Sequence, residues 1–166
     1  IPYAPDGLPL VGPMPGVPNA FECCVFTFGI VQAGGAGKLM AEIIIEGEPE
    51  TDSWAVDPRR FTDHVDRAYS IAKAIETYSH EYATHYPHIQ WPAGRPAKTS
   101  TLYDRLKNEG AEFGSYGGWE RADWFPQGAD ERKPAQSFKR QHWHHTVGAE
   151  CRHVAEHAGV IDLTGF

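Results

Sequence analysis

Three features that mark common classes of protein are missing from these 166 residues. There are only three cysteines, and the adjacent pair Cys23 and Cys24 does not make a disulfide framework, so a reducing compartment is expected. No apolar run approaches the roughly 20 residues that a membrane-spanning helix needs. Positive charge is scarce as well, and the net charge of −7 argues against nucleic acid as the main partner. We therefore predict a cytoplasmic protein that binds neither membranes nor nucleic acid.

What the sequence does contain is enough apolar material for one globular domain. Hydrophobic residues make up 41% and aromatic residues 12% of the chain, which excludes a disordered tail. The opening stretch is rich in proline and cannot form a domain by itself, and the closing residues GVIDLTGF read as a strand that is cut off. We therefore expect a piece of a longer polypeptide.

A glycine cluster at Gly34, Gly35 and Gly37 is the most conspicuous motif. An apolar run over residues 20–28 predicts a buried strand before it, and apolar residues at helical spacing predict a helix after it that ends at Gly47. The lysine after the last glycine is not followed by Ser or Thr, and the spacing does not fit G-x-G-x-x-G, so both phosphate-binding motifs are excluded. Two interpretations stay open: a turn needed only for packing, or a turn whose helix amides face an electron-rich group.

The rest of the chain alternates between helical and extended patterns. The expected elements are a long amphipathic helix capped by Asp57 that ends before Pro87, a short helix with Thr101 as its cap and Gly110 as its stop, a strand or hairpin over residues 112–125, a polar linker over 128–137, and a helix that ends at Gly159.

Several segments stand in an order and at a spacing that resemble one protein family. They are PDG at residues 5–7, PLVGP at 9–13, FTFGI at 26–30, GGAGK at 34–38, GEP at 47–49 and VDPRRF at 56–61, then HYP, RP, LYDRL, GAEFG and GWERADWF, and finally VGAECRHVAEHAGVIDLTGF. The first segments resemble the end of the FAD-binding domain of D-amino-acid-oxidase-like flavoproteins. The whole series is most similar to the dimethylglycine dehydrogenase and sarcosine dehydrogenase family.

This resemblance implies a fold and a division into domains. The implied fold is α+β, with the last strand, glycine turn and helix of a D-amino-acid-oxidase-like FAD domain followed by a small central domain of helices and a β-hairpin. The implied domains are residues 1–56 for the end of the FAD domain, 57–127 for the central domain, and 128–166 for a linker and the start of an aminomethyltransferase-like folate-binding domain.

The resemblance also implies an activity. The family oxidises an N-methyl amine, such as sarcosine or dimethylglycine, with FAD and passes the one-carbon unit to tetrahydrofolate in a part of the protein outside this chain. The expected partners are this small amine and the rest of the parent polypeptide, while a homo-oligomer is left open. In a eukaryote, the implied location is the mitochondrial matrix.

The site residues follow from the same resemblance, position by position. The residues expected along the flavin are Thr27, Phe28, Gly29, Ile30, Val31, Gly34 and Gly35. Phe28 is expected to face the substrate as well. Amides at the helix start would stabilise the negative charge that a reduced flavin carries. Some related amine oxidases have a lysine at the position of Val31, so the resemblance leaves the identity of the substrate open; the catalytic residues are expected outside this chain, which alone should be inactive.

Other functions are weighed beside this one. A non-catalytic structural or channelling module that packs on a separate flavoprotein would carry the same fold. The nine histidines, including those of the stretch HWHH at residues 142–145, invite a metal site, but no second pair of cysteines completes a zinc set and no metal is predicted. The charged residues of the YDR and WER segments could act as acid or base; we expect interdomain ion pairs instead, made by Asp104, Arg105, Glu120 and Arg121.

Overall fold

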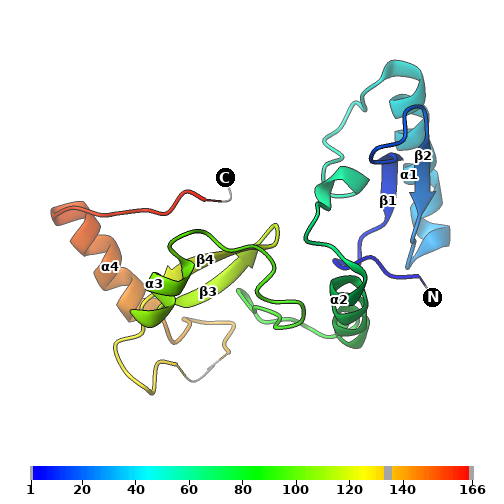
Figure 1. Cartoon of the computed structure of the whole chain (residues 1–166). Helices are drawn as coiled ribbons and strands as arrows, with labels where there is room; N and C mark the ends of the chain where they lie inside the picture. The colour runs from blue at the N-terminus through cyan, green and yellow to red at the C-terminus, as the bar shows by residue number, and fades with distance from the viewer. Residues whose placement is uncertain (1, 133–135, 165–166) are drawn as a thin grey trace. The chain divides into compact units, whose positions relative to one another are not determined.

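The computed structural model describes residues 2–132 and 136–164 of the chain. These residues form two compact units that divide after residue 82 (Figure 1). Each unit combines helices with one two-stranded antiparallel sheet. The fold is therefore a small α+β fold, as the sequence predicts.

Strand β1 (Leu10–Pro13) lies at the centre of the first unit and pairs antiparallel with β2 (Phe21–Cys24). Val11 is 1% exposed, and its N–H donates to the carbonyl oxygen of Val56 at 2.9 Å. The prediction of a buried strand over residues 20–28 is wrong in length and in burial, because β2 has four residues and three of them are exposed. The residue after β2 has a φ of 62°, which turns the backbone away from the pairing.

Helix α1 (Gly29–Glu46) begins earlier than the sequence predicts. The three-glycine cluster lies inside this helix, so the predicted glycine turn is wrong; the turn is made by residues 25–28. Good helix formers follow the cluster, and a helix that has begun gains a hydrogen bond with each residue, so it continues through glycines that cost about 1 kcal/mol each. Its predicted end is confirmed, since Gly47 has the left-handed conformation with a φ of 87°. Ile43 of α1 is buried, and α1 contacts β1.

The long helix expected after Asp57 is wrong, because two separate helices form there. The Asp57 side chain caps a single turn, the 3-10 helix η1 (Pro58–Arg60), and accepts from the Arg59 N–H at 2.7 Å. The backbone is extended at the next residue, and Asp66 then caps helix α2 (Arg67–His80) by accepting from the Tyr69 N–H at 2.7 Å. Each aspartate starts its own helix because a side-chain cap favours non-helical backbone at the capping residue itself.

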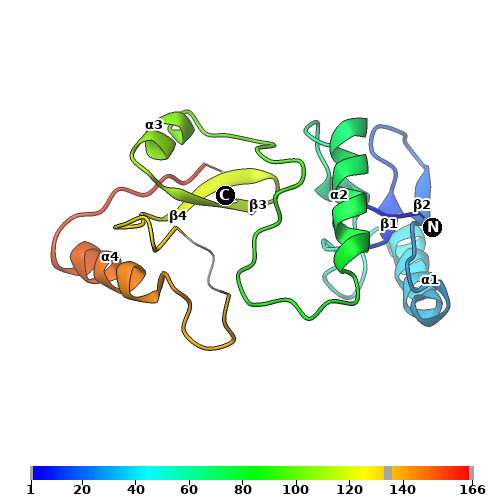
Figure 2. The same cartoon turned by 90° about the horizontal axis from the view of Figure 1, so that it is seen from below.

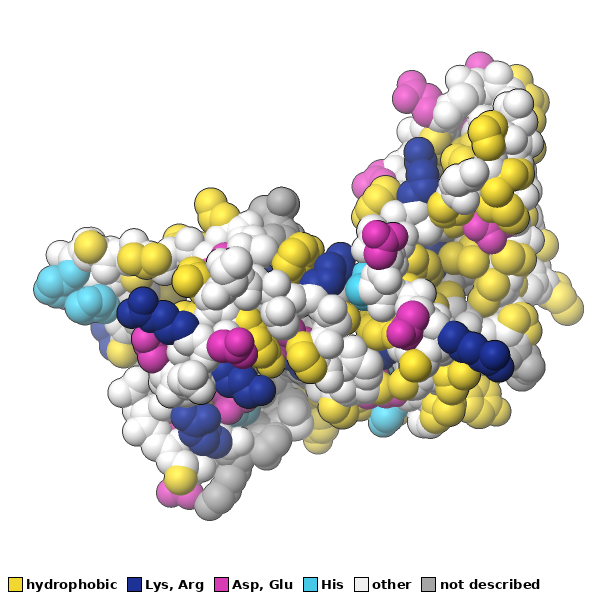
Figure 3. Space-filling view, in the orientation of Figure 1, with side chains coloured by type: hydrophobic (Ala, Val, Ile, Leu, Met, Phe, Trp, Pro, Cys, Tyr) yellow, Lys and Arg dark blue, Asp and Glu magenta, His cyan; other side chains and the backbone are white. Residues whose placement is uncertain are grey.

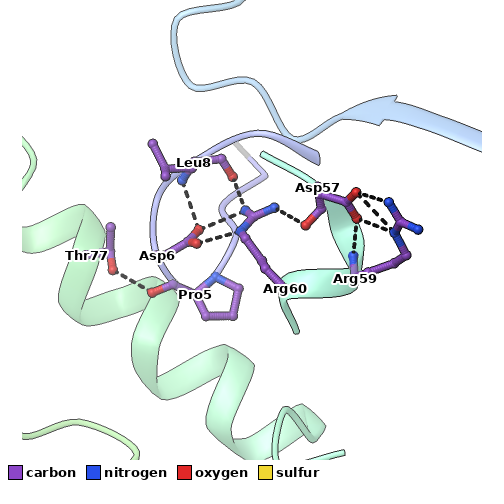
Figure 4. A network of polar contacts seen from close by, with 7 residues as sticks. All are labelled: Pro5, Asp6, Leu8, Asp57, Arg59, Arg60 and Thr77. Atoms are coloured by element: carbon purple, nitrogen blue, oxygen red, sulfur yellow. Dashed lines mark hydrogen bonds and ion pairs between the residues drawn. The ribbon is translucent and has the colours of Figure 1, made fainter. Parts of the chain in front are cut away.

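Arg60 ties the N-terminal loop to η1 (Figure 4). Its guanidinium donates to the two carboxylate oxygens of Asp6 at 2.7 and 3.0 Å, and to the carbonyl oxygens of Leu8 and Asp57 at 3.0 Å each. The Arg60 side chain is only 8% exposed. Burial raises the pKa of Asp57, but hydrogen bonds from Arg59 outweigh burial and hold this pKa below its usual value. The pairing of the Arg60 guanidinium with both carboxylate oxygens of Asp6 is the strong, bidentate form of an arginine–carboxylate contact.

The second unit is built on a β-hairpin. Strands β3 (Glu112–Tyr116) and β4 (Trp119–Trp124) pair antiparallel, as predicted for residues 112–125. Gly117 and Gly118 join them with φ values of 57° and 85°, which is the conformation of a tight hairpin turn and one that glycine adopts without strain. Helix α3 (Tyr103–Asn108) precedes the hairpin and α4 (His144–Glu156) follows it, and the two lie on either side of it in Figure 2.

Two details of these helices differ from the prediction. Thr101 does not cap α3; the Ser100 hydroxyl instead accepts from the Leu102 N–H at 3.2 Å, while the predicted stop at Gly110 is confirmed by its φ of 93°. Helix α4 ends at Glu156, before the predicted Gly159. The expected linker, residues 128–137, has no helix or strand where it is described, and its residues 133–135 lie outside the described residues.

The closing strand expected after Gly159 does not form within the described residues. Residues 158–163 belong to no helix or strand, and Val160 is 97% exposed. The Ser100 hydroxyl donates to the Asp162 carboxylate at 2.6 Å and anchors this segment to the residues before α3. A lone strand without a neighbour leaves its backbone groups to water, which explains why the sequence pattern alone does not produce a sheet here.

A buried ion pair fixes the hairpin to the segment before α3. The Arg95 guanidinium donates to both carboxylate oxygens of Glu120 at 2.9 and 2.6 Å, and to the carbonyl oxygen of Phe113 at 2.8 Å. Glu120 is 5% exposed. The expectation that Glu120 and Arg105 make interdomain pairs is wrong, because Glu120 pairs within the second unit and Arg105 pairs with Glu109 along its own helix.

Replacing Arg60 with alanine should loosen the N-terminal loop. The change leaves Asp6 without its ion-pair partner and removes the guanidinium hydrogen bonds to the Leu8 and Asp57 carbonyl oxygens, so we expect about 2–3 kcal/mol less unfolding free energy. Hydrogen–deuterium exchange in residues 4–14 should become faster. Lys38→Ala, which removes a pair whose lysine is 67% exposed, is the control and should cost less than about 1 kcal/mol. Equal exchange rates in both variants would show that Arg60 does not hold the loop.

Candidate functional site

The residues predicted to line a flavin, Thr27 to Val31, form the turn before α1 and its first turn. The first helical hydrogen bond runs from the Gln32 N–H to the Phe28 carbonyl oxygen at 3.1 Å. The N–H groups of the first turn therefore point out of the helix end without a helical acceptor. Phe28 occupies the capping position without a side-chain hydrogen bond, and the first turn has no acidic residue. The positive end of the helix dipole is thus uncompensated, which suits an anionic or electron-rich group.

The side chains around this helix end are apolar and largely open to solvent. Ile30 is 95% exposed, Val31 is 81% exposed and Phe28 is 46% exposed. Hydrophobic side chains gather over the first unit on the face that Figure 3 shows. A helix start that combines open amides with bare apolar side chains can bind a flat, partly polar ring.

Gly34 and Gly35 do not lie at this helix end. They sit inside α1, where their N–H groups belong to the helical ladder. A Cβ atom added at Gly34, Gly35 or Gly37 would meet nothing within 4 Å. The cluster is thus a strip without side chains on the outer surface of α1. A role of Gly34 and Gly35 toward a flavin stays a prediction, and it would depend on close approach to this strip.

An aromatic cluster that sequence reasoning missed lies beside the helix end. The rings of Phe28 and Tyr82 meet edge to face with centroids 6.4 Å apart, and those of Tyr3 and Tyr78 do so at 5.3 Å. The Tyr3 hydroxyl donates to the carboxylate of Glu81. Tyr78, Glu81 and Tyr82 share the end of α2 at helical spacing, but nothing in the sequence connects them with Tyr3. We call these five residues the tyrosine cluster.

Electrostatics tie the tyrosine cluster to the turn before α1. Burial, then the hydrogen bond and charge of the Glu81 carboxylate, raise the pKa of Tyr3 to about 12, while the Thr27 hydroxyl acts in the opposite direction. Tyr3 therefore lies within reach of both Thr27 and Glu81 and stays protonated at neutral pH. A hollow of about 350 Å³ opens beside it, lined by Tyr3, Ala74, Ile75 and Tyr78.

A second hollow, of about 450 Å³, lies in the second unit. Its polar side chains bind one another: the Tyr116 hydroxyl donates to Asp123 at 3.1 Å, and Arg95 is held by Glu120. Arg132 and Gln136 also line it, and no site is assigned there.

The histidines do not converge on a metal within residues 2–132 and 136–164. No group of three His, Cys, Asp or Glu side chains there could hold an ion. The His153 and His157 rings stack at 4.5 Å near the end of α4, and those of His144 and His145 meet edge to face. Among the described helices, none is both long enough and apolar enough to cross a membrane.

Comparison with known proteins identifies two domain families along the chain. Residues 46–100 match the family described as FAD dependent oxidoreductase central domain, and residues 102–166 match the GCVT N-terminal domain. Mitochondrial dimethylglycine dehydrogenase of Mus musculus is 39% identical over 167 residues, which cover 100% of this chain and 19% of that protein. Mitochondrial sarcosine dehydrogenase of Homo sapiens is 36% identical over 132 residues, covering 76% of this chain and 14% of that protein.

The chain belongs to the family of FAD-dependent oxidoreductases that includes the dimethylglycine and sarcosine dehydrogenases. It spans 19% of the length of this dimethylglycine dehydrogenase and matches 14% of the length of this sarcosine dehydrogenase. A further relative has a name of another kind: the mitochondrial pyruvate dehydrogenase phosphatase regulatory subunit of Mus musculus is 30% identical over 169 residues, covering 99% of this chain and 19% of that protein.

The family assignment fits the resemblance carried by the sequence motifs. The two domain matches meet near residue 101, whereas the structure divides after residue 82. The domain boundaries predicted after residues 56 and 127 stay predictions, as do the residues expected to line the flavin.

Filling the glycine strip should strengthen α1. Gly35→Ala adds a methyl group in open space at a helical position, so we expect the unfolding free energy to rise by about 0.5–1 kcal/mol. Gly47→Ala is the matched control. It should lower the free energy by about 1 kcal/mol, because the φ of 87° strains any side chain. Thermal unfolding of the two variants measures both effects, and a destabilised Gly35→Ala variant would mean that something covers the strip.

Proposed function

We propose that this chain is part of an FAD-dependent dehydrogenase for N-methyl amino acids of the sarcosine or dimethylglycine type. The one-carbon unit removed from the substrate would pass to tetrahydrofolate in the aminomethyltransferase-like part of the protein. The names of two relatives and the matches to an FAD-dependent oxidoreductase family and a GCVT domain support this proposal. Residues 1–56 would be the end of the FAD domain and residues 57–127 the central domain.

The observation that carries the proposal is the uncompensated start of α1. Its open amides, without a capping side chain or an acidic neighbour, fit an electron-rich ring edge. The backbone of Thr27 to Val31 would hold the flavin there, and Phe28 would face the substrate. Bound FAD supplies a hydride acceptor. What these residues contribute is orientation, exclusion of water by apolar side chains, and stabilisation of negative charge at the ring.

The proposal also covers the longer polypeptide to which this chain would belong and its cellular compartment. Catalytic residues and the folate site would lie in the remainder of a longer polypeptide, since this chain spans 19% of dimethylglycine dehydrogenase. In a eukaryote the protein would work in the mitochondrial matrix, which agrees with the mitochondrial names of the relatives.

A regulatory or structural module is the second candidate. The observation that favours it is the match to a phosphatase regulatory subunit over 99% of the chain. The two candidates differ in a simple property, because a dehydrogenase must hold FAD in a stoichiometric amount and oxidise an N-methyl amine, whereas a module of this kind need do neither.

Ile30→Glu in the full-length protein tests whether the start of α1 lies against the flavin. A carboxylate in the first turn interacts favourably with the helix dipole and should stabilise α1 by about 0.3–1 kcal/mol. The same charge would oppose negative charge on the flavin. We therefore expect the flavin reduction potential to fall by tens of millivolts, because a nearby unit charge contributes on the order of 1–2 kcal/mol. Absorbance titration against reference dyes measures the potential.

Ile45→Glu is the matched control, since it makes the same change at the other end of α1, where the side chain is 75% exposed. It should leave the flavin potential unchanged and should destabilise α1 slightly. A wild-type protein without FAD would refute the dehydrogenase proposal. Equal potentials in the two variants would instead refute the placement of the flavin at the start of α1.

A further inference from the structure

We propose that the tyrosine cluster, Tyr3, Phe28, Tyr78, Glu81 and Tyr82, receives the protonated methylamino group of the substrate. This inference rests on the proposed function for the identity of the substrate. It deepens that function by assigning a binding site for the ammonium group to residues of this chain.

The charge at the end of α2 indicates a cation. Glu81 is the C-cap of α2, where the helix dipole is negative and a second negative charge is unfavourable. A positive charge bound there would offset the negative end of the helix dipole and the charge of the Glu81 carboxylate. No ion pair within residues 2–132 and 136–164 involves Glu81, and its described hydrogen bond comes from the uncharged Tyr3 hydroxyl to one oxygen, Oε2. Its other oxygen can accept an N–H from a ligand.

The neighbours of Glu81 select the kind of cation. The Tyr3 ring, whose hydroxyl donates to Glu81, meets the Tyr78 ring edge to face. Tyr82, which follows Glu81 in the chain, meets the Phe28 ring in the same way. Aromatic faces attract ammonium groups whose charge is spread over methyl groups, and rings grouped in this way are how proteins recognise methylated amines. A metal ion would require more oxygen or nitrogen ligands than one carboxylate supplies.

There is room for a small ligand beside the cluster, and the ligand can reach it from solvent. The hollow beside Tyr3 and Tyr78 has a volume of about 350 Å³, which exceeds the size of a small amino acid. Tyr82 is 84% exposed and Tyr78 is 57% exposed, so a ligand reaches their faces without moving the backbone. Because Phe28 belongs both to the cluster and to the expected flavin wall, a bound methylamino group would lie beside the start of α1.

Glu81→Gln in the full-length protein removes the charge and keeps the shape. Isothermal titration would compare the binding of dimethylglycine with that of 3-methylbutanoate, which has the same shape and carboxylate but no ammonium group. We expect dimethylglycine to bind about tenfold more weakly to the variant, because a hydrogen bond to a charged group is lost. The binding of 3-methylbutanoate should change less than twofold.

Two comparisons separate charge from ring contacts. Tyr82→Phe keeps an aromatic face and should bind dimethylglycine almost normally, whereas Tyr82→Leu should weaken its binding several-fold. Glu46→Gln, at the far end of α1, removes a carboxylate outside the cluster and should change nothing. Unchanged dimethylglycine binding in Glu81→Gln, or an equal loss for both ligands, would overturn the inference.

The same experiments distinguish a failure of the tyrosine-cluster assignment from a failure of the proposed function. A protein that holds FAD and oxidises dimethylglycine with the same KM in Glu81→Gln would contradict only the cluster assignment. A protein without FAD that still binds dimethylglycine through Glu81 would support the cluster and refute the dehydrogenase.

Discussion

The bidentate contact between Arg60 and Asp6 is the interaction on which the first unit depends. An arginine offers five donors in a fixed plane, and Arg60 uses them for one carboxylate and two backbone carbonyls. The loop that precedes β1 is thereby fixed to η1. The Thr77 hydroxyl of α2 donates to the Pro5 carbonyl oxygen at 3.0 Å and adds a second anchor to the same loop. A segment rich in proline and glycine, which has little structure of its own, is ordered by side chains more than fifty residues away.

This anchoring places the candidate site. Tyr3 precedes the anchored loop and reaches Thr27 in the turn before α1 and Glu81 at the end of α2. The positive end of one helix and the negative end of another are therefore brought close to the same tyrosine. Opposite helix ends close to one tyrosine suit a zwitterion or a pair of groups of opposite charge.

Large apolar surfaces remain on both helices of the first unit. Ile30, Val31 and Ile45 of α1 and Ile75 of α2 are each more than 60% exposed. Ala4, Val11 and Ile43 are among the buried apolar residues of the first unit. Exposed apolar faces of this kind mark surfaces that contact other protein or ligand. Full-length relatives provide about five times the length of this chain, and this supports the view that much of the surface is covered in a longer polypeptide.

The sequence by itself determined the local features, because each depends on a few neighbouring residues. These include the end of α1 at Gly47, the cap at Asp57, the stop at Gly110 and the hairpin at Gly117 and Gly118. The motif series also determined the family. The glycine pattern did not predict the start of α1, because a helix that has begun continues through glycines that cost only about 1 kcal/mol each. Only the tertiary structure brought Tyr3 to Glu81 and Arg95 to Glu120. Those pairs are separated by 78 and 25 positions, and no local pattern encodes a contact made by folding the chain back on itself.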